Sequence, residues 1–321
     1  MDKIWVLAEQ KDGEPASSAL EMLAAARRFA SQVEAITYGS GAAGAAASLG
    51  EHGASRLYDA GELGDSLPGA RLAAAIAALI EQKGAPDAIF LAQSYDGRDI
   101  AGRLSARLDR PVLTNIVGLS DEGGALLSEH AIFGGTKVLR ARFTGEGPGI
   151  FVIRPKTFTA EPAGGQPAAV ESVELPETGA TDGAKVVGRH EEERTGPQLD
   201  EAEVVVSGGR GLGAAESYAL VEELAKLLNG AAGASRAIVD AGWVPYANQV
   251  GQTGKTVKPT VYIACGISGA TQHMVGMKGS KHIIAINKDE SAPIFTIADL
   301  GVVGDVHAVL PKLIEAVKAR K

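Results

Sequence analysis

The sequence predicts an α/β protein of two domains, the first with a mostly parallel sheet extended by antiparallel strands and the second with a doubly wound parallel sheet. In both halves of the chain, short apolar runs of strand length alternate with segments of helical period. The length of 321 residues suits two domains of ordinary size. Between residues 159 and 199 the apolar period fades while Pro, Gly and Glu accumulate, which is typical of a solvated connector or of a strand with a long charged flank. We therefore place the boundary near residue 195, with domains at 1–195 and 196–321.

The N-terminal domain is expected to begin with parallel strands joined by helices. Apolar runs predict buried strands at residues 4–8, 33–38, 54–59 and 88–92, and amphipathic segments predict helices at 17–30 and 68–83. Pro68 suits a first helical turn and Gly84 suits a C-terminal cap. Strands separated by helices pair in parallel through crossover connections.

The pattern changes after Arg110. Four apolar runs, at residues 111–119, 131–133, 137–143 and 150–153, are separated by Gly pairs and polar turns. No helical period lies between them, so we expect antiparallel strands that complete the first domain.

The C-terminal domain restarts with a buried strand at 203–207. Further strands are predicted at residues 237–240, 260–265 and 282–287, and helices at 216–228, 271–277 and 305–319. Glycine-rich or polar turns follow or approach these strands. Ligands of open parallel sheets bind outside the carboxyl ends of the strands, so these turns are the candidate binding region.

Composition excludes several classes of protein. A formal net charge of −8 without a basic run argues against a nucleic-acid partner. The lone Cys265 permits no internal disulfide, and its place at the end of a buried strand is typical of a small apolar residue. No signal peptide is apparent, and the longest apolar stretch, 72–80, is about half a membrane span. We expect a cytoplasmic protein without membrane insertion, and we assign no metal site.

Three turns resemble known motifs only in part. Residues 207–213 could approach a phosphate and add the charge of Arg210, but they depart from the GxGxxG spacing. Residues 249–256 end like a P-loop, but Gln249 stands where that motif needs Gly. Residues 266–270 nearly form a hydrolase elbow around Ser268, with Ala270 in place of the last Gly. Possible partners for such a serine are His282 or His307 with Asp289, Asp299 or Asp305.

Five blocks, taken together and in order, resemble the alpha subunit of electron transfer flavoproteins. They are residues 205–212, 233–242, 249–255, 266–273 and 286–295, within a match that spans roughly 200–310. The N-terminal domain matches more loosely, through its opening strand and residues 96–104.

The resemblance implies a Rossmann-like C-terminal domain that binds FAD in an extended form. By this resemblance Arg210, Ser235 and Ser268 lie along the pyrophosphate and ribityl chain, while Asn287, Asp305 and Val306 hold the adenosine end. Contacts to phosphates and flavin are implied for Val250, Gly251, Gln252, Thr253, Ser268, Gly269, Ala270, Thr271, Gln272 and His273. Thr271 and Val306 depart from the residues usual in the family.

The resemblance also implies three residues that tune the flavin. Arg236 is expected beside the ring system, Thr253 at the central ring nitrogen, and His273 near the carbonyl between the pyrimidine nitrogens. A flavin that carries single electrons needs its singly reduced form stabilised. A charge at ~4 Å contributes roughly 4 kcal/mol at an effective dielectric of about 20, before solvent screening. A surface role for Arg236, and a role as a surface or satisfied residue for His273, are the plainer alternatives.

The implied partner is an electron transfer flavoprotein beta subunit, for which the N-terminal domain is a platform in a heterodimer. The implied traffic runs from flavin dehydrogenases of acyl-CoA type to a membrane quinone reductase, so the chain is an electron carrier rather than an enzyme. Three other hypotheses remain open on the residues alone: an NAD-dependent oxidoreductase, a nucleotide-binding regulatory module and a hydrolase using Ser268.

Overall fold

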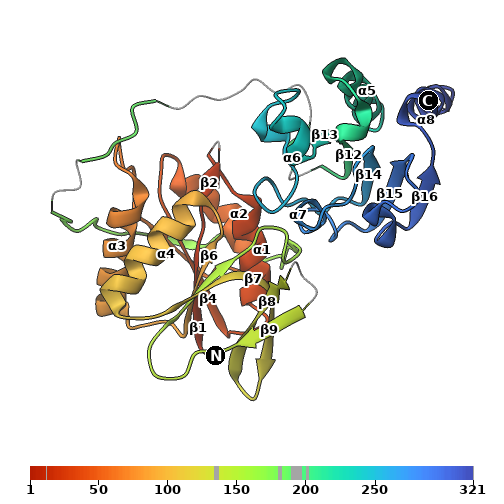
Figure 1. The fold of residues 1–321 in the computed structure, drawn as a ribbon. Helices are drawn as coiled ribbons and strands as arrows, with labels where there is room; N and C mark the ends of the chain where they lie inside the picture. The colour runs from red at the N-terminus through yellow and green to blue at the C-terminus, as the bar shows by residue number, and fades with distance from the viewer. Residues whose placement is uncertain (12, 134–136, 180–182, 189–196, 200–201, 321) are drawn as a thin grey trace. The chain divides into compact units, whose positions relative to one another are not determined.

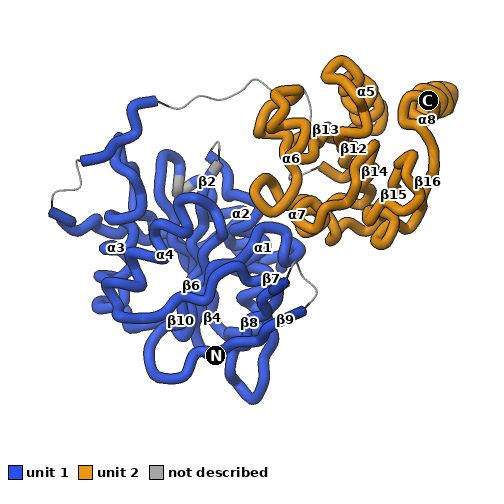
Figure 2. The backbone as a smooth tube through the Cα atoms, viewed as in Figure 1, with its two compact units in different colours: residues 1–190 blue, residues 191–321 orange. Residues whose placement is uncertain are grey.

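The chain divides into two compact units, residues 1–190 and 191–321 (Figure 2). The computed structural model describes the chain except residues 12, 134–136, 180–182, 189–196, 200–201 and 321. The predicted boundary near residue 195 falls within 189–196 and so lies outside the described residues. Each unit is described by itself.

The N-terminal unit is built on a nine-stranded sheet (Figure 1). Its strands are β1 (Lys3–Leu7), β4 (Gln32–Thr37), β5 (Arg56–Asp59), β6 (Ala88–Ala92), β7 (Val112–Glu122), β8 (Ala125–Ile132), β9 (Lys137–Ala141), β10 (Gly149–Ile153) and β11 (Ala169–Ser172). They lie in the order β11-β5-β4-β1-β6-β10-β7-β8-β9. A small antiparallel hairpin, β2 (Gln10–Lys11) and β3 (Glu14–Pro15), stands apart from this sheet. The alternation of strand and crossover helix therefore produces the parallel sheet that the sequence predicts.

Helices cover both faces of this sheet. On one face, α1 (Ser17–Ala26) and α2 (Ala46–Glu51) bury an apolar stripe that includes Met22, Leu23 and Leu49. On the other, α3 (Pro68–Lys83) and α4 (Tyr95–Leu108) pack apolar side chains against β1 and β6. The helix α4 is not expected from the sequence, because its buried face is narrow and the rest of the helix is charged. Ser94 caps α4 by accepting a hydrogen bond from the backbone N–H of Gly97 at 2.7 Å.

One predicted strand orientation in this unit is wrong. β8 pairs antiparallel with β7, and β9 pairs antiparallel with β8, as expected. β10, expected to be antiparallel, instead pairs in parallel with both β6 and β7. The chain returns across the sheet edge after the β8–β9 ribbon and inserts β10 between two existing strands. In the connector region, β11 pairs in parallel with β5, which is the strand alternative considered for that stretch.

The C-terminal unit has a five-stranded parallel sheet. Its strands are β12 (Val204–Gly208), β13 (Ala231–Ala234), β14 (Val261–Cys265), β15 (His282–Asn287) and β16 (Leu300–Val303), in the order β13-β12-β14-β15-β16. The chain runs outward in one direction from β12 to β13 and in the other from β14 to β16. The strand order therefore reverses between β12 and β14, and a crevice is expected outside their carboxyl ends.

The two faces of this second sheet are covered differently. The helices α5 (Ala219–Leu227) and α8 (Val306–Lys318) bury their apolar stripes on one face. The other face is covered mainly by loop residues such as Val250, Val257 and Ile294, together with Met277 beyond the short helix α7 (Thr271–Met274). These covering residues pack against strand residues that include Val205, Tyr262 and Ala264.

Another predicted strand is wrong. Residues 237–240 are expected as a strand, but the short helix α6 (Arg236–Val239) occupies this place and the strand is β13, just before it. The Ala-Ala-Gly-Ala sequence of β13 lacks the β-branched residues that indicate strands. Small residues are needed there, since a Cβ on Gly233 would lie 2.3 Å from the Ser207 Oγ of β12. The expected helix at 216–228 starts as the 3-10 turn η4 (Ala215–Tyr218) before α5.

Candidate cofactor site

A cavity of about 830 Å³ lies at the carboxyl edge of the C-terminal sheet, within the usual size range of ligand pockets. Its walls come from the loops that follow all five strands of this sheet, so it lies where the reversal of strand order predicts a crevice. Residues from 210 to 306 contribute to it.

Most of the residues expected to hold a cofactor line this one cavity. They are Arg210, Ser235, Arg236, Val250, Gly251, Gln252, Thr253, Ser268, Ala270, Gln272, His273, Asn287, Asp305 and Val306. Gly269 and Thr271 lie between lining residues but are not part of the lining. Gly269 instead packs against the backbone of Ile294, because a Cβ there would lie 2.3 Å from the Ile294 nitrogen.

Other lining residues are not among the expected cofactor-binding residues, although all but Gly304 lie within the five blocks that carry the resemblance. They are Gly211, Ala237, Asp240, Gln249, Gly266, Ile267, Lys288, Asp289, Ala292, Pro293 and Gly304. Several of them directly follow a strand, as Gly266 follows β14 and Lys288 follows β15. A search for the first residues after each parallel strand would have found these.

Glycines let the loops after β12 and β14 cross in direct backbone contact. The N–H of Gly209 donates to the carbonyl of Cys265, and that of Gly211 donates to the carbonyl of Gly266, both at 2.9 Å. A Cβ on Gly209 would lie 2.5 Å from the Gly266 oxygen, and one on Gly211 would lie 2.7 Å from the Gly266 Cα. Gly266 also has a φ of +64°, which other residues rarely adopt. These glycines therefore join the two halves of the cavity floor.

Arg236 contributes a charge that is exposed and already paired. Its Nε lies 3.0 Å from the Oδ2 of Asp240, one turn further along, and the two side chains are 67% and 60% exposed. Both residues line the cavity. An ion pair this open to solvent has its electrostatic energy strongly screened, and Asp240 offsets part of the positive potential. The estimate of roughly 4 kcal/mol for the Arg236 charge is therefore an upper bound.

The loop at 249–255 is folded on itself and does not form an open P-loop. The N–H groups of Gly251 and Lys255 bond to backbone carbonyls of the same loop, at 3.1 and 2.7 Å. That of Gln252 bonds to the carbonyl of Gln272 at 2.8 Å. Phosphates in a P-loop need such amides as donors, so the ATPase interpretation loses its physical basis.

Thr253 in this loop has an oriented hydroxyl group. Its Oγ1 accepts a hydrogen bond from the Nε2 of the buried Gln249 at 2.9 Å, and its carbonyl accepts one from the Tyr246 hydroxyl. Because the oxygen accepts from Gln249, the Thr253 hydroxyl proton can be donated toward the cavity.

His273 presents one ring nitrogen to the protein and leaves the other unused. The side chain is 6% exposed, and its Nε2 lies 3.0 Å from the Tyr262 hydroxyl. Nδ1 has no partner within hydrogen-bond geometry in the described part of the chain. Burial lowers the pKa of His273 to about 4, and the nearby backbone of Val250 opposes this shift in part. The imidazole is therefore neutral at pH 7.

Asn287 and Asp305 shape the far end of the cavity. The Nδ2 of Asn287 donates to the carbonyl of Ile267 at 2.9 Å, and its Oδ1 accepts from the N–H of Asp289 at 3.0 Å. Asp305 caps α8 by accepting from the N–H of His307 at 2.9 Å. These side chains thus fix the loops after β14, β15 and β16 as well as lining the cavity.

The hydrolase interpretation is not supported by the geometry. Within the residues that the structure describes, no hydrogen bond joins the Ser268 hydroxyl to a histidine. The helix that follows, α7, has only four residues, whereas the elbow motif leads into a long helix. Burial raises the pKa of the Cys265 thiol to about 12, so this cysteine is not an alternative nucleophile.

Two other kinds of feature, a metal-binding cluster and a membrane-spanning helix, are absent from the described residues. No cluster of three or more His, Cys, Asp or Glu side chains there could hold a metal ion. Among the helices of that same part of the chain, none is long and apolar enough to cross a membrane.

Both units match known protein families. A family model described as the electron transfer flavoprotein FAD-binding domain matches residues 198–278, and one described as the electron transfer flavoprotein domain matches residues 4–178. The electron transfer flavoprotein subunit alpha of Mycobacterium leprae is 42% identical over 329 residues, with 100% of both chains covered. That of Mycobacterium tuberculosis is 44% identical over 326 residues, also with 100% of both covered. Protein FixB of Clostridium saccharobutylicum is 39% identical over 323 residues, with 98% of this chain and 96% of the relative covered.

Proposed function

Because the chain belongs to the electron transfer flavoprotein alpha subunit family, we propose that it accepts electrons from flavin dehydrogenases of acyl-CoA type and passes them singly to a membrane quinone reductase. FAD is the cofactor of the domain that the family model matches. The chain acts in the cytoplasm as an electron carrier, with no substrate turnover of its own.

The observation that carries the proposal is the cavity at the carboxyl edge of the C-terminal sheet. Its lining includes residues from the loops that follow all five strands of the sheet, which suits an elongated dinucleotide. It also has a buried polar atom without a partner in the described chain, Nδ1 of His273, and a ligand with an acceptor group would satisfy it. The residues present therefore fit FAD.

The side chains divide into three groups along the cavity. Arg210 supplies a positive charge and Ser268 a hydroxyl group toward the pyrophosphate and ribityl chain, and the residues Asn287, Asp305 and Val306 hold the adenosine end. When bound, FAD takes up and releases electrons at its flavin ring. Arg236, Thr253 and His273, which line the cavity, would offer that ring one cation and two neutral donors that orient it and favour negative charge on it.

The chain is further proposed to work in a heterodimer with an electron transfer flavoprotein beta subunit. The N-terminal unit, which has its own closed core, serves as the platform for that subunit. This division of labour places the binding chemistry in one unit and the assembly surface in the other.

The test is to co-purify the chain with its beta subunit and record the absorbance spectrum during stepwise reduction. We expect a yellow complex that takes up electrons in two separate one-electron stages and passes them to a quinone reductase. A colourless complex that binds NAD or ATP instead would contradict the proposal. Hydrolysis of an ester that is lost on Ser268→Ala would favour the hydrolase hypothesis.

A further inference from the structure

The His273 side chain is contacted by a tyrosine, Tyr262, that is the second residue of β14. Tyr262 is completely buried, and its hydroxyl lies 3.0 Å from the His273 Nε2. It packs within the apolar layer on the loop-covered face of the sheet, with Val205, Val250 and Ile283. In the sequence this tyrosine lies within a continuous apolar run and resembles an ordinary core residue. The histidine follows it only eleven positions later, outside that run.

We propose that Tyr262 is a positioning residue that donates its hydroxyl proton to Nε2 of His273 and so keeps the histidine proton on Nδ1, as a fixed donor toward the bound cofactor. This inference rests on the proposed function, since FAD supplies the acceptor. It concerns the tautomer of His273, which sets whether the cavity wall offers a donor or an acceptor at this point.

The direction of the Tyr262–His273 hydrogen bond follows from what each group can do. A neutral imidazole has one donor nitrogen and one acceptor nitrogen. If Nε2 accepts from the tyrosine, the proton is on Nδ1. If Nε2 donated instead, the buried tyrosine O–H would need another acceptor and the Nδ1 lone pair would face the cavity. Leaving a buried donor unpaired costs about 1–3 kcal/mol, so the first arrangement is favoured.

The surroundings of the tyrosine support this direction. Burial raises the pKa of the Tyr262 phenol, so it keeps its proton and remains able to donate. Ser207 lies near the phenol and opposes this pKa shift in part, while its Oγ has no partner within strict hydrogen-bond geometry in the described chain.

The consequence for function is a neutral donor of fixed orientation. The His273 Nδ1–H faces a cofactor carbonyl without adding a charge, and its hydrogen bond strengthens as that carbonyl gains electron density. Removing the Tyr262 hydroxyl frees the imidazole to exchange its proton between the two nitrogens. The acceptor tautomer would then place a lone pair against the carbonyl and disfavour electron uptake.

The experiment is nitrogen NMR of the FAD-loaded heterodimer labelled with ¹⁵N-histidine. The His273 ring signals are assigned by their loss in His273→Gln. The protonated and bare ring nitrogens of a neutral imidazole resonate far apart, so the spectrum reports which nitrogen carries the proton. We expect Nδ1–H in the native protein and signals of both tautomers, or their average, in Tyr262→Phe.

Two further measurements make the test specific. We expect Tyr262→Phe to keep FAD and to lower the first reduction potential by about 60 mV, a tenfold change in the one-electron equilibrium. The matched control is Tyr218→Phe, which also removes a buried hydroxyl, one that donates to the Gly233 carbonyl at 3.1 Å and lies outside the cavity lining. This control should leave the His273 signals and the potential unchanged.

Several outcomes would overturn the inference. Nε2–H in the native protein would do so, even if Tyr262→Phe fails to fold. A Tyr262→Phe spectrum identical to the native spectrum would also overturn the inference. A heterodimer without FAD would contradict the proposed function instead, because the tautomer of His273 can still be read in that complex.

Discussion

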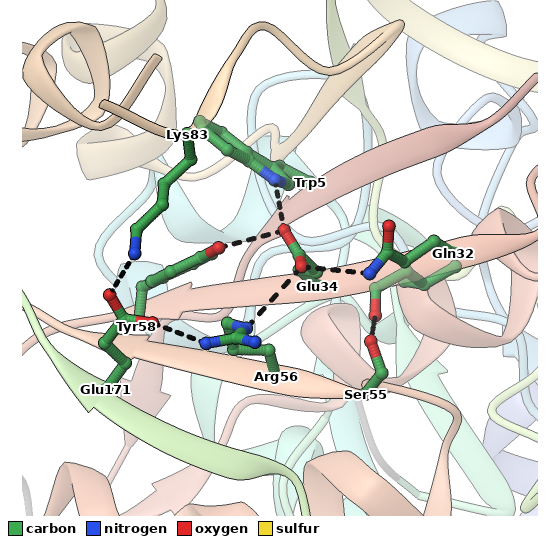
Figure 3. Close-up of polar contacts among 9 residues, drawn as sticks. Trp5, Gln32, Glu34, Ser55, Arg56, Tyr58, Lys83 and Glu171 are labelled. Atoms are coloured by element: carbon green, nitrogen blue, oxygen red, sulfur yellow. Dashed lines mark hydrogen bonds and ion pairs between the residues drawn. The ribbon is translucent and has the colours of Figure 1, made fainter. Parts of the chain in front are cut away.

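Each unit of this protein buries ionisable side chains, and one from each unit, Glu34 and His273, are treated in opposite ways. In the N-terminal unit, Glu34 of β4 is 3% exposed and fully engaged with protein donors (Figure 3). Its Oε2 accepts from the Trp5 Nε1 at 2.8 Å and from the Tyr58 hydroxyl at 3.2 Å. Its Oε1 accepts from the Gln32 Nε2 at 3.3 Å and lies 3.7 Å from the Arg56 Nε. In the C-terminal unit, His273 lines the cavity, its Nε2 is bonded to Tyr262, and its buried Nδ1 has no partner within hydrogen-bond geometry in the described chain.

The Glu34 cluster continues to the edge of its sheet. Arg56 also binds Glu171 of β11 at 2.5 Å, and Lys83 at the end of α3 binds the other oxygen of Glu171 at 2.6 Å (Figure 3). These contacts join β1, β4, β5, β11 and α3 by polar groups that satisfy one another. A buried polar network of this kind fixes a single packing arrangement.

The difference between the two sites separates a structural role from a binding role. Burial alone marks both residues, so it does not tell them apart. The completeness of their hydrogen bonding distinguishes them. Both carboxylate oxygens of Glu34 have protein partners, whereas the Nδ1 of His273 has none within the described chain and could bond to a ligand. The comparison predicts that changes at the first site affect stability and changes at the second affect the cofactor.

The largest expected effect is on stability, from Glu34→Ala. The change leaves the Trp5 and Tyr58 donors buried without an acceptor and should lower the free energy of unfolding by about 3–5 kcal/mol. Glu34→Gln keeps one acceptor oxygen and should lose about half as much. Urea unfolding followed by circular dichroism measures this. FAD content per folded protein should stay unchanged, and a selective loss of FAD would break the comparison.

The second effect is a pH dependence of stability that arises from His273. Its pKa is about 4 in the folded protein and 6.5 in the unfolded chain, so between these values the unfolded state binds more protons. The His273 contribution to the free energy of unfolding is therefore complete above about pH 6.5. As the pH falls toward 4, the free energy of unfolding decreases by up to about 3 kcal/mol. Urea unfolding of the cofactor-free protein at pH 7.5, 6 and 5 measures the slope. His273→Gln should flatten it, and an equal slope in both proteins would contradict the assignment.

The third effect tests the crossing of the two loops at the floor of the cavity. Gly209→Ala places a Cβ 2.5 Å from the Gly266 carbonyl oxygen and forces the loops apart. Such overpacking costs about 2 kcal/mol and should weaken FAD binding at least tenfold. Gly279→Ala is the matched control, because its Cβ would meet Lys258 at an ordinary 3.6 Å. FAD dissociation constants from flavin fluorescence compare the two, and equal values would mean that the loops can yield.

The smallest effect concerns the exposed charge at the cavity mouth. Arg236→Lys should keep FAD and lower the yield of the singly reduced flavin, with a fall in first reduction potential of less than about 60 mV. Asp240→Asn removes the partner that lies 3.0 Å from Arg236 and should raise the potential instead. Stepwise reduction followed by absorbance measures both. If neither variant changes the potential, Arg236 has only a surface role.

Much of the site was predictable because it follows the ends of strands. Polar and glycine-rich turns after residues 203–207 and 260–265 are local features of the sequence, and the fold brings them to one edge because the strands are parallel. Family resemblance added the residues between these turns. The roles of individual side chains toward FAD stay predictions.

What the sequence did not predict depends on contacts between distant residues. β13 was missed because its small residues are selected by the Ser207 side chain of the neighbouring strand, not by strand propensity. The parallel pairing of β10 depends on which gap in the sheet it enters. Glu34 and Tyr262 both lie in apolar runs, and only the folded chain gives them Trp5 and His273 as partners.

The crossing of Gly209 and Gly211 with Gly266 has a consequence for how the holoprotein is made. The floor of the cavity unites segments more than fifty residues apart, and its far wall ends at Val306. When only β12 and the turn after it have been synthesised, the loop after β14 that completes the floor of the cavity does not yet exist. We therefore expect FAD to bind only after synthesis has passed Val306 and the sheet has assembled.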